Sequence, residues 1–206
     1  RGDTRDAEKW PDFVEEALAK IKDLRQLQAA EEDSPQLVQA LNTLTTELIA
    51  HLKRHRRALY ELDPRTFEKL VAEVLASFGW QVDLTPKSTD GGYDIFALSP
   101  DRDVGVKNSW IIECKRYAPD NPVGVDIVRA LYGSNLLNRG DQAAGMKMLA
   151  TTSHFTAGAK AFKASRYDLA LKDYEGILDW LNTYRPNPNG RLYIDTGGKL
   201  VVPGEE

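Results

Sequence analysis

The order of helical and strand-like hydrophobic patterns between residues 62 and 181 is the strongest constraint on the fold. The stretch opens with apolar residues that recur every three or four positions from 67 to 78, which predicts a helix. Asp63 and Pro64 suit its N-cap and first position, and Gly79 suits its end. Three apolar runs typical of strands follow, at residues 80–84, 93–98 and 109–114.

Helical and strand-like patterns then alternate along the chain. The predicted elements are a helix at 125–137, a strand at 146–151, a helix at 157–164, a strand at 169–171 and a helix at 174–181. A helix, three strands and then alternating helices and strands predict an α/β fold, in which helices flank a mixed β-sheet. We therefore expect one domain at residues 61–185.

The segments on either side of this domain have different patterns. Residues 1–60 hold two apolar stripes at helical spacing, separated by the polar string 31–33, and predict an α-helical hairpin. Residues 186–206 contain Gly197 and Gly198 and predict a C-terminal hairpin or tail. A basic run at 51–57 fits either a DNA-backbone contact or the ordinary C-terminal turn of a helix, and the sequence leaves both open.

Composition excludes some classes of protein. No run reaches the about 18 apolar residues of a membrane-spanning helix, so no membrane contact is expected. The single cysteine, Cys114, cannot form an internal disulfide, which favours a cytoplasmic location. The net charge of −4 argues against a general polyanion-binding surface but is compatible with a local basic patch. The chain begins without an initiator methionine, as expected for a fragment of a longer protein.

Most of the chemistry in the chain is concentrated between residues 91 and 115. Asp94 stands in the string Gly-Gly-Tyr-Asp-Ile, and Glu113 and Lys115 stand in Ile-Ile-Glu-Cys-Lys. On a strand, Glu113 and Lys115 point to the same face because they are two residues apart. Turn-forming residues at 99–103 favour a hairpin that brings Asp94 beside them.

Two adjacent carboxylates and a lysine suit metal-dependent hydrolysis of a phosphodiester. The carboxylates repel each other, and a hard divalent cation such as Mg²⁺ removes that repulsion. Such a cation polarises the phosphate and lowers the pKa of a water, while Lys115 orients the water and offsets developing charge. The structural alternative is an exposed ion pair between Glu113 and Lys115, which would contribute at most about 1 kcal/mol.

Further acids and one histidine are weaker candidates. At about 100° per residue, Glu68 lies at the flank of the apolar stripe of its helix and can reach the edge of the sheet, whereas Glu73 is expected to face solvent. Flanking glutamates are also common on ordinary helices. Asp90 is either a turn former or a further metal-site acid, and His154 is either a loop histidine or a general base.

The chain resembles the Mrr-type restriction endonucleases, a family within the PD-(D/E)xK nuclease superfamily. The resemblance spans roughly residues 62–181 and depends on several motifs in order. These motifs are Phe67-Glu68-Lys69-Leu70, Gly79-Trp80-Gln81-Val82, Asp90-Gly91-Gly92-Tyr93-Asp94-Ile95, Glu113-Cys114-Lys115-Arg116-Tyr117, Val123-Gly124, Val128-Arg129-Ala130-Leu131-Tyr132-Gly133 and Ala150-Thr151-Thr152-Ser153-His154-Phe155-Thr156.

The resemblance implies a restriction-endonuclease-like fold and a role for each site residue. Asp94 and Glu113 would be metal ligands, Lys115 the catalytic lysine and Glu68 an assisting acid from the helix. Members of the family cut DNA with Mg²⁺, for which Mn²⁺ is expected to substitute, in restriction of foreign or modified DNA. Because double-strand cutting generally needs two active sites, a homodimer or larger assembly is expected. Residues 1–60 do not resemble a winged-helix recognition domain, and dimerisation, attachment or targeting are their expected roles.

Two other functions fit the sequence. The negative net charge and the unassigned helical hairpin suit a non-cleaving DNA-binding or assembly module that keeps a nuclease fold. The argument against this function is that a non-catalytic protein gains nothing from placing the carboxylates of Asp94 and Glu113 side by side. A nuclease for branched DNA in repair or recombination, or one for RNA, would use the same metal chemistry, so the site residues do not separate these targets.

Overall fold

The computed structural model describes residues 46–85, 92–100, 108–134 and 145–186. The chain forms two compact units, and the larger one contains His55–Arg185. In the smaller unit, residues 46–54 are helical. The rest of the predicted N-terminal hairpin, the turn containing Asp90 and nearly all of the predicted C-terminal hairpin lie outside the described residues. None of the helices in the described ranges is both long and apolar enough to cross a bilayer.

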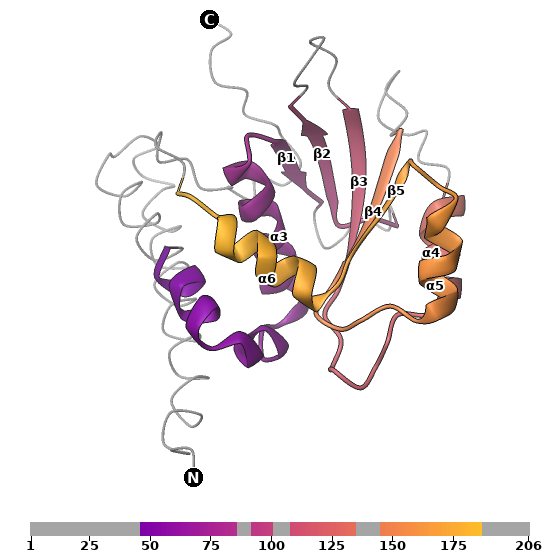
Figure 1. Cartoon of the computed structure of the whole chain (residues 1–206). Coiled ribbons are helices and arrows are strands. Elements are labelled where there is room, and N and C mark those ends of the chain that lie inside the picture. Colours follow the sequence, from indigo (N-terminus) through magenta and orange to yellow (C-terminus); the bar gives the residue numbers. More distant parts are fainter. Residues whose placement is uncertain (1–45, 86–91, 101–107, 135–144, 187–206) are drawn as a thin grey trace, which may run out of the picture. The chain divides into compact units, whose positions relative to one another are not determined.

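The larger unit contains the predicted elements in the predicted order (Figure 1). A 3-10 turn, η1, comes first, so the basic run at 51–57 is divided between the end of one helix and the start of this turn. The elements are η1 (Arg56–Tyr60), α3 (Pro64–Ser77), β1 (Gln81–Leu84), β2 (Ile95–Ser99), β3 (Asn108–Lys115), α4 (Val125–Gly133), β4 (Met146–Thr151), α5 (Ala157–Ala164), β5 (Leu169–Lys172) and α6 (Tyr174–Thr183).

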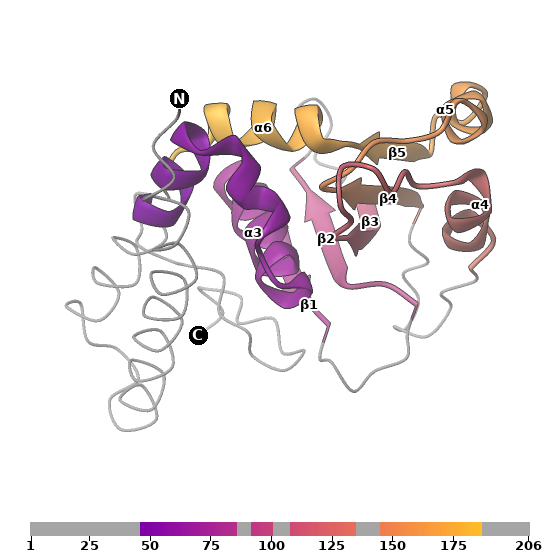
Figure 2. The ribbon, with the colours of Figure 1, turned by 90° about the horizontal axis from the view of Figure 1, so that it is seen from below.

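The five strands form one sheet in the order β1-β2-β3-β4-β5. Strand β2 is antiparallel to β1 and to β3, whereas β4 is parallel to β3 and to β5. Helices α3 and α6 lie on one side of the sheet and α4 and α5 on the other (Figure 1). The view from below shows α4 and α5 together, away from α3 (Figure 2). The prediction of a mixed sheet flanked by helices is therefore confirmed.

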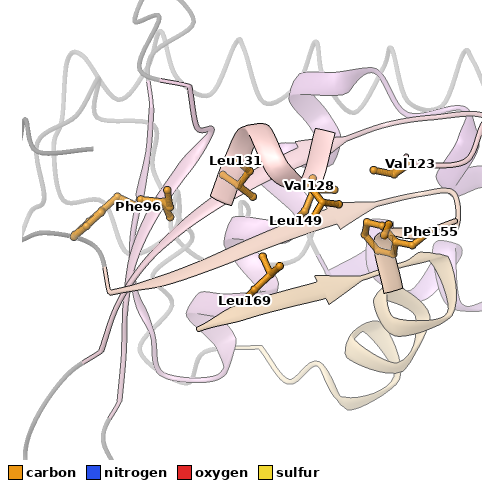
Figure 3. Close-up of a cluster of buried hydrophobic side chains, with 9 residues drawn as sticks. Phe96, Val123, Val128, Leu131, Leu149, Phe155 and Leu169 are labelled. Carbon is orange, nitrogen blue, oxygen red and sulfur yellow. The ribbon is translucent and has the colours of Figure 1, made fainter. Parts of the chain in front are cut away.

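One hydrophobic core cluster fills the space between the sheet and helices α4 and α5 (Figure 3). It consists of nine buried apolar side chains: Phe96, Ile111, Val123, Val128, Leu131, Leu149, Phe155, Ala159 and Leu169. Because side chains alternate along a strand, Ile111 points to this core and Ile112 to the α3 side. The same alternation places Glu113 and Lys115 on the α4–α5 side of β3, at its C-terminal end.

Helix α3 begins as its sequence predicts. The Asp63 side chain accepts a hydrogen bond from the Thr66 backbone N–H at 3.1 Å, which satisfies a donor that the helix itself leaves unpaired. Proline at the first position fits because it has no N–H to lose. Gly79 follows the helix with φ of +84°, a conformation that favours glycine. This fixed start determines where the first turn of α3, which carries Arg65 and Glu68, meets the sheet.

The expectation that Glu73 faces solvent is wrong. Glu73 is 7% exposed, and its carboxylate accepts a hydrogen bond from the Tyr184 hydroxyl at 2.9 Å. Tyr184 follows the last turn of α6 and is itself 7% exposed. Helix α3 therefore has a second buried side in addition to the apolar stripe that its own sequence displays.

Replacing Tyr184 with phenylalanine is expected to lower the free energy of unfolding by about 2 kcal/mol, because it removes a hydroxyl donor from a buried carboxylate. Urea denaturation of the two proteins measures the difference. Tyr167→Phe is the matched control: Tyr167 is 92% exposed, so the same deletion should change stability by less than about 0.5 kcal/mol. Equal stability of Tyr184→Phe and the wild type would contradict the assigned hydrogen bond.

Candidate active site

Strands β2 and β3 bring Asp94, Glu113 and Lys115 together. The register pairs Ile95 with Ile112, and Asp94 stands immediately before β2. The backbone N–H of Asp94 donates to the Ile112 carbonyl oxygen at 3.0 Å, which anchors the acid beside β3. The antiparallel pairing expected from the sequence is thus present.

Glu113 and Lys115 contact each other on the shared face of β3. The Lys115 Nζ lies 2.5 Å from Glu113 Oε1, and the two side chains are 31% and 18% exposed. Burial alone would lower the pKa of Lys115, but the hydrogen bond to Glu113 and the charges of Glu113 and Asp94 outweigh it and raise that pKa. Lys115 is therefore a protonated donor at neutral pH rather than a general base. This pair is mostly buried and stands next to a third charge, unlike the exposed ion pair of the structural alternative.

Asp94 is held as an acceptor in a partly buried position. Its Oδ2 accepts a hydrogen bond from the Cys114 backbone N–H at 2.7 Å. Burial raises the pKa of Asp94, while that hydrogen bond and the charges of Lys115 and Arg65 act in the opposite direction. The acid thus carries a desolvation cost that a bound cation would relieve.

Cys114 lies between Glu113 and Lys115 in sequence but points to the other face of β3. Its pKa is raised well above the ordinary value, first by burial and then by the negative charges of Asp94, Glu68 and Glu113. A thiol in this environment stays protonated and is a poor nucleophile.

Glu68 lies on helix α3, on the side of the sheet to which Cys114 points, and is paired with Arg65. The Arg65 Nη1 donates to Glu68 Oε2 at 2.8 Å, and the two side chains are 12% and 15% exposed. The same nitrogen donates to the Thr85 carbonyl oxygen at 2.9 Å, just after β1. The sequence reasoning missed Arg65. The available signal was its position three residues before Glu68, a spacing that places both on one helical face.

The donor set fits a magnesium-type cation. Among the described residues, no three histidine, cysteine, aspartate or glutamate side chains form a preassembled metal cage. Asp94 and Glu113 instead offer two carboxylates at one strand end, and Mg²⁺ commonly binds one or two carboxylates while keeping water and phosphate oxygens as its other ligands. Mn²⁺ accepts the same oxygen donors. A cation there would replace the positive charge that Lys115 now supplies to Glu113.

Backbone contacts fix the chain beyond Lys115. The Thr152 hydroxyl donates to the Tyr117 carbonyl oxygen at 2.7 Å and accepts from the Tyr117 N–H at 2.9 Å. The Arg116 Nη1 donates to the Tyr60 carbonyl oxygen at 3.2 Å, which attaches η1 to the end of β3. His154, the weaker histidine candidate, is exposed, and its Nδ1 lies 3.5 Å from the Ser153 hydroxyl. These hydrogen bonds hold the chain that follows β3 in place. They do not align His154 as a general base.

Similar proteins were found by sequence and by fold. The chain is 28% identical over 146 residues to the uncharacterized protein y4cE of Sinorhizobium fredii, a match covering 70% of this chain and 36% of that protein. The chain therefore spans about a third of the length of this relative. The DNA modification-dependent restriction endonuclease AspBHI matches with a TM-score of 0.48 and 21% identity, over 66% of this chain and 35% of its own.

The MspJI restriction endonuclease, solved with a 27-mer oligonucleotide, matches with a TM-score of 0.46 and 18% identity over 70% of this chain and 33% of its own. The family model Mrr_cat, described as a restriction endonuclease, matches residues 59–181. That match covers more than half of the chain and includes β2, β3 and the first turn of α3. The chain therefore belongs to the restriction endonuclease family that Mrr_cat describes.

Proposed function

We propose that this protein is a Mg²⁺-dependent DNA endonuclease that hydrolyses phosphodiester bonds in the restriction of foreign or modified DNA. Membership of a restriction endonuclease family already indicates a nuclease that acts on DNA. The finer proposal depends mainly on one observation: Asp94, Glu113 and Lys115 converge at the paired ends of β2 and β3. Mn²⁺ is proposed to substitute for Mg²⁺ because both bind oxygen ligands.

Each residue has a distinct task in this proposal. Asp94 and Glu113 would hold the cation, which when bound supplies positive charge that polarises the phosphate and lowers the pKa of water. Lys115, protonated at neutral pH, would then be free to donate to a phosphate oxygen on which negative charge develops. Glu68 would assist from α3. The raised pKa of Asp94 favours cation binding, since binding relieves the burial cost of its charged form.

A cleavage panel tests the proposal. Supercoiled plasmid, methylated plasmid, branched DNA and RNA are incubated with the protein in Mg²⁺, in Mn²⁺ and in excess chelator. We expect cleavage of at least one DNA form with either metal and none with chelator. Lys115→Ala and Asp94→Ala, purified identically, should be inactive; equal nicking by all three proteins would identify a contaminant.

The panel also separates the competing functions. DNA binding without cleavage of any form would refute the endonuclease and favour the non-cleaving assembly module. Cleavage confined to branched DNA or to RNA would reassign the enzyme to repair, recombination or RNA processing. Cleavage of methylated but not unmodified plasmid would support restriction of modified DNA.

The assembly and the flanking segments belong to the same proposal. We assign residues 1–60 to dimerisation, attachment or targeting, residues 61–185 to catalysis and residues 186–206 to a C-terminal hairpin or tail. A homodimer would supply two active sites for double-strand cutting, and sedimentation of the protein with and without DNA tests it. The single cysteine supports an enzyme that acts in the reducing cytoplasm.

A further inference from the structure

Arg65 connects two parts of the site through one nitrogen atom. Its Nη1 donates both to Glu68 Oε2, at 2.8 Å, and to the Thr85 carbonyl oxygen, at 2.9 Å. The first contact is to an acid on α3, and the second is to the backbone that leaves β1. With 12% of its side chain exposed, Arg65 is mostly buried, which distinguishes this contact from an exposed helical ion pair.

Thr85 is in turn hydrogen-bonded to the backbone of Asp94. The backbone N–H of Thr85 donates to the Asp94 carbonyl oxygen at 2.8 Å. Two hydrogen bonds therefore lead from the guanidinium of Arg65 to the backbone of Asp94, and a third leads to the carboxylate of Glu68.

We propose that Arg65 is a positioning residue of the active site, which fixes the Glu68 carboxylate relative to the backbone of Asp94. This inference rests on the proposed nuclease function, because Glu68 and Asp94 belong to the site proposed above. Arg65 acts by holding an acid from one element and the backbone of another at a constant separation.

The affinity for Mn²⁺ distinguishes positioning from a simple effect of charge. If only its charge mattered, removing the cationic Arg65 would strengthen binding of another cation nearby. If Arg65 positions the acids, Arg65→Met should instead weaken Mn²⁺ binding by about 10-fold or more, the loss typical of groups that orient metal ligands. Arg65→Lys keeps a donor and should recover much of the loss. Calorimetric titration of the full chain with Mn²⁺ measures all three proteins.

A double-mutant cycle in DNA cleavage tests whether Arg65 acts through Glu68. Arg65→Met and Glu68→Gln are each expected to reduce the cleavage rate by about 10- to 100-fold. The double variant should lose less than the product of the two single losses, because the second substitution removes a group that is already misplaced. Arg166→Met is the matched control: Arg166 also donates from Nη1 to a backbone carbonyl, that of Phe162, but at α5.

Several outcomes would overturn the inference. Unchanged or tighter Mn²⁺ binding in Arg65→Met, a double variant equal to the product of its singles, or a lysine variant no better than methionine would each do so. Equal losses in Arg65→Met and Arg166→Met, accompanied by equal falls in melting temperature, would show general destabilisation instead. A wild type that binds Mn²⁺ but cleaves nothing refutes the nuclease alone, and the Mn²⁺ titrations still decide the role of Arg65. A wild type that binds no Mn²⁺ refutes both.

Discussion

Asp94→Asn is expected to reduce DNA cleavage by at least about a thousandfold and, at the same time, to make the metal-free protein more stable at neutral pH. The loss of cleavage follows from the loss of a proposed metal ligand. The gain in stability follows from the raised pKa of Asp94, for which burial is the main cause. Because the folded state then binds this proton more tightly than the unfolded state, the free energy of unfolding falls as pH rises from 3.8 through the folded pKa. Asparagine removes that cost and can still accept from the Cys114 N–H.

Thermal unfolding in chelator at pH 7 and near pH 4 measures the effect. The melting temperature of Asp94→Asn should exceed that of the wild type by a few degrees at pH 7, and the difference should shrink toward pH 4, where Asp94 takes up its proton. Saturating Mn²⁺ should then raise the melting temperature of the wild type but not that of the variant. Asp179→Asn, on the exposed side of α6, makes the same chemical change and should affect neither property. A variant that binds Mn²⁺ like the wild type would remove Asp94 from the metal site.

Lys115→Met is expected to reduce cleavage by about 10²- to 10³-fold while Mn²⁺ binds at least as tightly as before. Lys115 now occupies Glu113 Oε1 at 2.5 Å, so an incoming cation must compete with it for that oxygen. Removing the lysine removes the competitor but also the proposed donor to the phosphate. Because the pKa of Lys115 is raised above its usual 10.5, the wild-type rate should show no alkaline loss from this group through about pH 9.

Single-turnover cleavage and Mn²⁺ titration on the same preparations separate the two effects. Lys160→Met is the control, since Lys160 lies exposed on α5 and its loss changes the net charge by the same amount. Substantial cleavage by Lys115→Met would exclude a catalytic lysine. Loss of Mn²⁺ binding in that variant would instead indicate that Lys115 maintains the site rather than acting on the phosphate.

The order of the elements, and the proximity of Asp94, Glu113 and Lys115, were predictable from the sequence because both depend on local periodicity. Strand β4 and helix α5 have the predicted bounds, since alternating and helical hydrophobic patterns are properties of adjacent residues. Asp94, Glu113 and Lys115 meet because the strands that carry them are consecutive and form a hairpin. The alternation of side chains along β3 and the short connection between β2 and β3 are enough to predict that these three residues lie close together.

Contacts between distant segments account for what the sequence did not predict. Glu73 is buried because Tyr184, 111 residues away, covers the side of α3 that its own pattern marks as polar. Arg65 gains its position from the Thr85 carbonyl, and no periodicity within α3 indicates where β1 ends. The burial of a polar residue such as Glu73 is missed when a helix packs against a second partner, because the apolar stripe indicates only the larger of the two buried sides.

The central place of β3 in the sheet also determines the order in which this unit opens. Strands β1 and β5 form the edges, whereas β3 is hydrogen-bonded to β2 on one side and to β4 on the other. Amide hydrogens of an inner strand exchange with solvent only in the rarer, more extensive openings, whereas those at the edges exchange through local fraying. Residues 111–115 should thus be among the slowest to take up deuterium. The strand that carries Glu113 and Lys115 would therefore keep its conformation during the local openings that expose the edge strands.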